Sequence, residues 1–285
     1  MPNAIGFVDN STMLAHYKML EKIRDFASSN GWTVLRYDTV SANRELILQG
    51  VGLSGDQQIF IGFATYQDVS SDYYNLVVAG FTGYVAGNTF YTQPGAAYSG
   101  VPAHNQRIDY WMTLNANRIA IGMKVGTPVY EHAYAGYGLT RTLPSQYPYP
   151  LVVGGMLNGI PAVRFSETSH SFPYRGTRTS PGNTTANLRL RFNSGVWLQP
   201  TTWPWMTDRL AWTTQLRDTG GIYPILPIIL LDANGMYCEL DGIFYISGFD
   251  NVTENTFTIA GINYVVLQDV GRNGFTDYIA MRLDA

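Results

Sequence analysis

Histidine is the residue best suited to acid–base or metal chemistry, and the chain has four, far apart in the sequence: His16, His104, His132 and His170. No two are spaced i, i+4 with a glutamate between them, the spacing that places zinc ligands on one helix face. Glu131 and His132 lie in a strand-like run, where neighbouring side chains point to opposite faces, so they do not share a site. His170 lies near Glu167 and could meet a serine, but the chain has no G-x-S-x-G nucleophile elbow. We therefore predict no catalytic residue and no metal site.

A glycine motif raises the question of a nucleotide cofactor. Gly50-Val-Gly-Leu-Ser-Gly55 matches G-x-G-x-x-G and follows the predicted strand at 45–49. Pyrophosphate binding also needs a helix to begin at this point, because the free N–H groups of the helix hold the phosphates. Instead Ile59, Ile61 and Phe63 alternate with other residues as in a strand. The motif predicts a glycine-rich turn, and we expect no cofactor.

Glycoside hydrolysis needs two carboxylates about 5–10 Å apart. Five carboxylates are available: Glu131, Asp208, Asp218, Asp232 and Asp241. Their spacing singles out no pair, and Asp232-Ala-Asn-Gly and Asp241-Gly are turn signals. A cell-wall glycan hydrolase therefore stays only the weakest alternative.

Charge is scarce in this sequence. The 285 residues include 21 acidic and 18 basic side chains, 14% of the chain, where about 25% is usual. Only three lysines and a net charge of −3 argue against nucleic acid as a partner. A single cysteine, Cys238, excludes an intrachain disulfide. The N-terminus lacks the pattern of an export signal, and the most apolar run, 222–231, is short and contains two prolines. A membrane helix needs about 20 apolar residues, so we predict a soluble chain without membrane insertion.

Arginine and aromatic residues gather between positions 145 and 205. Five arginines and one acidic residue lie between Arg164 and Arg191, and the strand pattern at 187–192 places Arg189 and Arg191 on one face. Arginine, tyrosine and tryptophan are enriched in the centres of protein interfaces. We predict that these residues form contacts with other subunits: Tyr147, Tyr149, Phe172, Arg175, Arg178, Arg189, Arg191, Trp197, Trp203 and Trp205. A solvated strand face is the alternative for the two strand arginines.

The elements that must position these residues are mostly strands. Apolar residues at helical spacing predict one amphipathic helix over 12–29, with Ser11 as N-cap and Asn30-Gly31 as its end. Eleven other segments alternate or form short apolar runs, separated by turn dipeptides such as Asn234-Gly235. We predict a mainly β fold with antiparallel sheets, sandwich or barrel-like, and a small C-terminal β module. The predicted domains are 1–165, a long Arg- and Trp-bearing loop or insertion at 166–206, and 207–285.

Three stretches carry a resemblance to a known group of proteins: 117–137 (Asn-Arg-Ile-Ala-Ile-Gly-Met-Lys), 144–151 (Pro-Ser-Gln-Tyr-Pro-Tyr-Pro-Leu) and 247–267 (Ser-Gly-Phe-Asp-Asn-Val-Thr-Glu). They look like uncharacterised virion structural proteins of tailed bacteriophages. The resemblance implies a multi-copy tail or baseplate component, made in the host cytoplasm, whose partners are its own copies and other virion proteins. It transfers no active-site residues. Capsid decoration, or a tail protein that binds a receptor or host surface glycan through Tyr147, Tyr149, Trp197, Trp203 and Trp205, remains an alternative.

Overall fold

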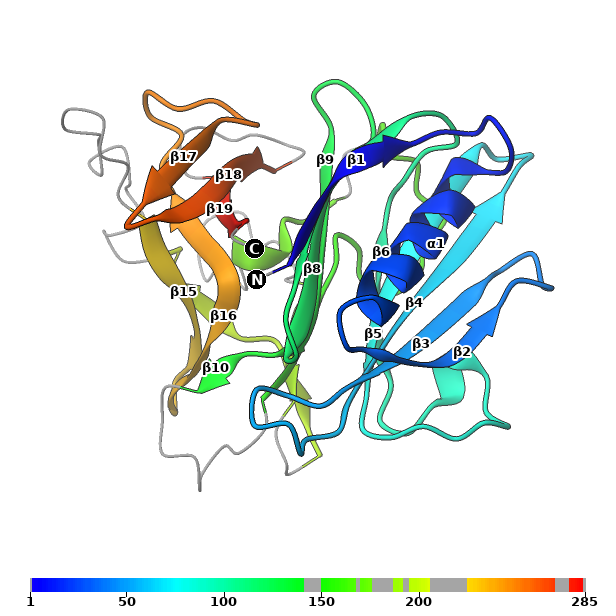
Figure 1. Cartoon of the computed structure of the whole chain (residues 1–285), viewed down its shortest axis with the longest axis horizontal. Helices are drawn as coiled ribbons and strands as arrows, with labels where there is room; N and C mark the ends of the chain where they lie inside the picture. Colours follow the sequence, from blue (N-terminus) through cyan, green and yellow to red (C-terminus); the bar gives the residue numbers. More distant parts are fainter. Residues whose placement is uncertain are drawn as a thin grey trace.

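Three antiparallel sheets stacked as layers make up the protein (Figure 1). The computed structural model describes residues 2–140, 150–167, 170–175, 187–191, 195–205, 225–269 and 277–283. The central sheet has the order β1-β7-β8-β9-β11-β12-β13. On one side lies the outer sheet, β2-β3-β4-β5-β6, and on the other the C-terminal sheet, β14-β15-β16-β19-β18-β17, with β10 paired to β16. The two termini lie side by side between the central and C-terminal sheets (Figure 1).

The strands of the central sheet have these bounds: β1 Asn3–Val8, β7 Ile108–Leu114, β8 Arg118–Lys124, β9 Tyr130–Tyr137, β11 Leu151–Gly154, β12 Leu188–Arg191 and β13 Trp197–Leu198. The outer sheet contains β2 Thr33–Asp38, β3 Glu45–Gly50, β4 Ile59–Asp68, β5 Tyr73–Phe81 and β6 Ala97–Val101. The C-terminal sheet contains β14 Thr201–Trp203, β15 Ile225–Asp232, β16 Gly235–Ile246, β17 Thr256–Ile259, β18 Ile262–Gln268 and β19 Tyr278–Arg282, and β10 is Leu139–Thr140. Two short 3₁₀ turns are η1 Phe90–Thr92 and η2 Pro173–Arg175.

The inner strands of the central sheet, β7, β8, β9 and β11, are buried on both faces. Along β8, Ile119, Ile121 and Met123 enter the core shared with the outer sheet, whereas Ala120 enters the core shared with the C-terminal sheet. Because side chains alternate between the faces of a strand, a strand covered on both faces is apolar at nearly every position. This explains why β8 has a continuous apolar run.

One helix, α1 (Ala15–Ser28), packs against the outer sheet and the first strands of the central sheet (Figure 1). Its apolar stripe, which includes Met19, Leu20 and Ile23, belongs to the core between these two sheets. The predicted N-cap at Ser11 is wrong: Leu14 occupies the cap without a side-chain hydrogen bond, and the N–H of Ala15 donates to Oδ1 of the distant Asn105 at 3.1 Å.

The sequence predicted this fold class, mainly β with one N-terminal helix and antiparallel sheets, and the structure confirms it. The Gly50–Gly55 motif is a turn that leads into β4, with Gly52 and Gly55 at positive φ, so the expected turn is also confirmed. Within the predicted 166–206 segment, β12 and β13 extend the central sheet and β14 begins the C-terminal sheet. The described parts of this segment therefore link two sheets. The predicted domain boundaries stay a prediction.

The Asp241-Gly242 turn prediction is wrong. These residues lie inside β16, where the pairing with β15 shifts register and Gly242 takes φ +71°. The pair forms an irregularity within a long strand, because an Asp-Gly pair accommodates a positive φ in a bulge as readily as in a hairpin turn. The neighbouring Asp232–Gly235 prediction is confirmed as the hairpin between β15 and β16.

Gly136 lies in β9 at a place where the backbone at the start of β8 approaches closely. It has φ +132°, and a Cβ there would lie 2.2 Å from the carbonyl oxygen of Asn117. We expect Gly136→Ala to lower the free energy of unfolding by roughly 2–4 kcal/mol, since strain and overpacking add. Gly31→Ala is the control, because Gly31 has φ +90° with nothing within 4 Å, and strain alone costs about 1 kcal/mol. Equal losses in urea unfolding would contradict this interpretation.

Candidate functional site

Five charged or titratable side chains meet inside the molecule, and we call them the buried charge network: Glu131, His170, Arg175, Asp269 and Asp277. Glu131 lies near the start of β9, His170 and Arg175 come from the segment at and before η2, Asp269 follows β18 and Asp277 precedes β19. Each of the five side chains is at most 6% exposed. Glu131 shares its face of β9 with Ala133 and Ala135, which belong to the core next to the outer sheet. Arg175 instead contacts residues that flank β18 and β19 of the C-terminal sheet. The 170–175 segment therefore contacts charged groups on both sides of the central sheet.

The network has two parts. In the first, Nδ1 of His170 lies 2.8 Å from Oε1 of Glu131, and Nε2 of His170 lies 3.1 Å from the carbonyl oxygen of Arg164. A carbonyl only accepts hydrogen bonds, so Nε2 carries a proton and Nδ1 faces the carboxylate. In the second, Nη1 of Arg175 donates to Asp277 at 3.0 Å and Nη2 lies 3.3 Å from Asp269. The planar guanidinium thus spans two carboxylates.

The pKa values of both groups in the first part of the network are raised. Burial raises the pKa of Glu131 to about 7, although the contact with His170 acts in the opposite direction. Oε2 of Glu131 is buried and has no hydrogen-bond partner among the described residues, which adds to the cost of ionising it. Burial opposes protonation of His170, but the contacts with Glu131 outweigh burial and raise its pKa. Asp269 raises the pKa of both groups.

A further buried ion pair lies between the central and C-terminal sheets. Arg118 of β8 is fully buried, its Nη1 donates to the carbonyl of Thr113 at 2.8 Å, and its Nε lies 3.9 Å from Asp241 of β16. The Asn115 amide also donates to Asp241, whose backbone N–H donates to the Tyr134 hydroxyl at 3.2 Å. These contacts hold the irregular part of β16 against the central sheet.

His132 points away from Glu131, as the strand pattern predicted. Its Nε2 lies 2.9 Å from the carbonyl oxygen of Gln268, and its ring packs against Phe172 and Tyr174. Burial lowers its pKa to about 4, so the ring is neutral at physiological pH. His132 is a core histidine that contacts β18.

Sequence reasoning missed the Glu131–His170 pair. The partner it considered for His170, Glu167, instead accepts a hydrogen bond from the N–H of Arg164 at 3.0 Å. Glu131 and His170 are 39 positions apart and no spacing rule connects them. The only signal was a carboxylate inside an otherwise apolar strand, which indicates a buried charge in need of a partner.

The predicted interface residues have separate locations. Leu188 and Leu190 are buried, whereas Arg189 and Arg191 are half-buried on the opposite face of β12, so the predicted alternation is confirmed. Arg189 donates to Asn158 at 2.9 Å. The Arg191 guanidinium lies 5.6 Å from the Trp197 ring centre, and the Trp197 indole N–H donates to the carbonyl of Gly95 at 2.9 Å. This edge of the central sheet therefore carries an arginine and tryptophan surface.

The other predicted interface residues do not extend this surface within the described ranges. Phe172, Arg175 and Trp205 are buried in the core between the central and C-terminal sheets. Trp205 packs edge-on against Phe172 and Tyr245. Trp203 is half-buried in β14. Tyr147, Tyr149 and Arg178 lie outside the described residues, so their role stays a prediction.

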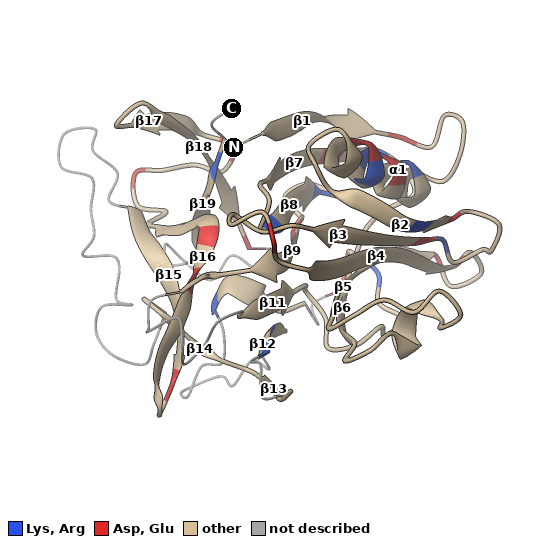
Figure 2. Ribbon diagram, turned by 60° about the horizontal axis from the view of Figure 1, so that its bottom comes forward, with Lys and Arg blue, Asp and Glu red and all other residues tan. Residues whose placement is uncertain are grey.

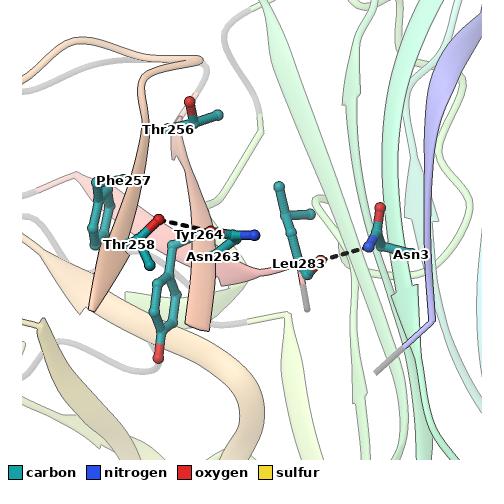
Figure 3. Close-up of a pocket in the computed structure, with 7 residues that line it drawn as sticks. All are labelled: Asn3, Thr256, Phe257, Thr258, Asn263, Tyr264 and Leu283. Atoms are coloured by element: carbon teal, nitrogen blue, oxygen red, sulfur yellow. Dashed lines mark hydrogen bonds between the residues drawn. The ribbon is translucent and has the colours of Figure 1, made fainter. Parts of the chain in front are cut away.

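An open pocket of about 420 Å³ lies between the start of β1 and the β17–β18 hairpin (Figure 3). Its described lining comprises Asn3, Thr256, Phe257, Thr258, Asn263, Tyr264 and Leu283. The amide of Asn3 donates to the carbonyl of Leu283, and Thr258 donates to Asn263 at 2.7 Å. Among these described residues the lining offers mainly neutral hydrogen-bonding groups, and the Tyr264 phenol is its one titratable side chain.

No three or more His, Cys, Asp or Glu side chains of the described ranges form a group that could hold a metal ion. In the same ranges no helix has the length and apolar character needed to span a bilayer. No protein-family model matches the sequence, and a search of curated proteins finds no relative.

The Glu131–His170 pair predicts a loss of stability toward alkaline pH. The pKa values of both groups lie above their unfolded values of 4.5 and 6.5, so the folded state binds more protons than the unfolded state. The contribution of Glu131 is full below pH 4.5 and is lost as pH rises to about 7, and that of His170 is lost as pH rises through its raised pKa. In urea unfolding between about pH 5 and 8, Glu131→Gln should abolish this fall. An unchanged slope would contradict the assignment.

Arg175 is expected to be essential for stability, because it is the guanidinium between Asp269 and Asp277. Arg175→Met would remove a guanidinium that contacts two buried carboxylates and should cost about 3–5 kcal/mol of the free energy of unfolding. Arg189→Met is the matched control, since Arg189 is half-buried and bonded to an amide, and should cost less than about 1 kcal/mol. Similar losses for the two variants in chemical denaturation would show that Arg175 is not a structural counter-charge.

Proposed function

We propose that the chain is a structural subunit of a bacteriophage virion, in the tail or baseplate, that acts through contacts with its own copies and other virion proteins. The observation that carries the proposal is where the protein places its few charges. Its surface of 11795 Å², shared among 39 charged residues, gives about one charge per 300 Å². Among the residues that the structure describes, six of these charged side chains are buried: Arg118, Glu131, Arg175, Asp241, Asp269 and Asp277.

The exposed surface is therefore poorer in charge than the composition alone implies. Figure 2 shows acidic and basic positions thinly scattered over a ribbon that is mostly uncharged. Large apolar side chains are also exposed, among them Ile5, Phe7 and Leu53 at 52–62%. Soluble monomers keep charge on their surfaces and limit apolar patches, since both oppose association. A surface of this kind supports a role in which other subunits cover much of it.

The titratable groups support a structural role for a second reason. Glu131, whose pKa is raised to about 7, and His170 have side chains that are at most 1% exposed, and they pair with each other. Catalysis needs such a group within hydrogen-bond reach of a substrate. Their burial and mutual pairing favour a structural role over a catalytic one.

The arginine and tryptophan surface of β12 and β13 fits the proposal as a contact region. Arg189 and Arg191 are half-buried near this edge of the sheet. A planar guanidinium binds carboxylates of a neighbouring subunit in two-point fashion. Glycan binding by the aromatic residues depends on Tyr147 and Tyr149, outside the described residues, and stays a prediction.

The composition of purified particles tests the proposal. Virions of the phage that encodes the chain should contain it in many copies after density-gradient purification and quantitative mass spectrometry. Antibody-gold labelling should mark the tail or baseplate. A replication enzyme from the same phage, present in the lysate and absent from particles, is the control. Detection of the chain in the lysate but not in the particles would overturn the proposal.

A further inference from the structure

The first strand, β1, forms one edge of the central sheet (Figure 2). It pairs with β7 in a continuous register from Asn3 to Val8. The carbonyl oxygen of Pro2 accepts from the N–H of Leu114 at 3.2 Å. In an antiparallel ladder, backbone groups of alternate residues point to the same side, so positions 2, 4, 6 and 8 face β7. The backbone N–H and C=O groups of Asn3, Ile5 and Phe7 therefore point away from the sheet.

Nothing in β1 blocks this edge. Proteins usually protect sheet edges with charged residues, proline, bulges, short strands or a covering segment. The sequence of β1, Asn-Ala-Ile-Gly-Phe-Val, has no charge and no proline, and its pairing shows no bulge. Ile5 is 55% and Phe7 is 52% exposed, and the two lie on the same face of the strand.

The other sheet edges in the described part of the chain are protected. β2 carries Arg36 and Asp38 and has a bulge. β6 is covered by the segment around Gly159, whose carbonyl accepts from the N–H of Gly100 at 2.6 Å. β13, β14 and β17 have two, three and four residues. β1 is thus exceptional among the described edge strands in combining a length of six residues, a ladder without a bulge and no charge.

We propose that β1 pairs antiparallel with β1 of a second copy of the chain, which joins two central sheets into one continuous sheet. The strand is complementary to itself. The pleat allows two central registers, and these place Ile5 opposite either Ile5 or Phe7 of the second copy. Apolar and aromatic cross-strand pairs of this kind stabilise a sheet, whereas like charges in opposite positions would oppose it, and β1 has none.

The surroundings of β1 allow the second copy to approach. Arg107 stacks on the Phe7 ring with its guanidinium 4.0 Å from the ring centre, and Asp109 neutralises it at 2.7 Å. At the other end, Asn3 lines the open pocket in Figure 3. Two-fold pairing of identical strands is a closed arrangement, so the contact yields a dimer. A dimer contact deepens the proposed function and rests on it for its place in a multi-copy particle.

Sedimentation velocity over a range of micromolar concentrations tests the pairing directly. The natural chain should form a dimer. Ile5→Lys places a charge beside the two-fold axis. Ile5→Pro removes an outward N–H and leaves the hydrogen bonds to β7 intact. Each should weaken dimerisation at least about tenfold. Val40→Lys, at a residue 97% exposed in the 39–44 turn, should leave dimerisation within about twofold of the natural chain. Circular dichroism would verify that each variant is folded.

A natural chain that stays monomeric, or an Ile5→Lys dimer as tight as the natural one, would overturn the pairing. The two proposals fail separately. A monomeric chain that is nevertheless found in purified virions removes only the β1 contact. A β1 dimer whose chain is absent from virions removes only the virion role.

Discussion

Coverage of the inner strands of the central sheet on both faces is the constraint on which the rest of the structure depends. A charged side chain at a buried position of these strands has no route to water and must find its counter-charge inside the protein, because an isolated buried ion is costly. Glu131 meets His170, and Arg118 meets Asp241. Both partners come from segments outside the central sheet. Segments outside the central sheet therefore supply apolar cover and also the groups that neutralise its buried charges.

This arrangement specifies how the layers fit together. Apolar side chains tolerate a shift of one layer against another better than buried ions do, since a displaced ion loses its partner entirely. The Arg175 guanidinium must reach both Asp269 and Asp277, one at the end of β18 and one before β19. The 170–175 segment can satisfy both contacts in few positions. Buried charge thus contributes to a unique arrangement of the sheets more than to their total stability.

Features that depend on neighbouring residues could be predicted from the sequence, whereas features that depend on distant residues could not. Alternation in segments such as 59–66 and helical spacing in 12–29 are properties of neighbouring residues, and they led to the right fold class. The Ser11 cap and the Asp241-Gly242 turn failed because a distant Asn105 and a pairing strand decided the local conformation. The Glu131–His170 pair had no local signal. Its partners meet only once three segments have packed together, a result of tertiary structure that spacing does not encode.

The hydrogen bond from Asn3 to the carbonyl of Leu283 has a topological consequence. It brings the two ends of the described chain together at the same point of the molecule (Figure 1). The described backbone therefore ends close to the place where it begins. A short linker could join the ends, and new termini opened in an exposed turn such as 39–44 would give a circular permutant with the same three sheets. In such a permutant the sheets would be synthesised in a different order but stacked in the same way.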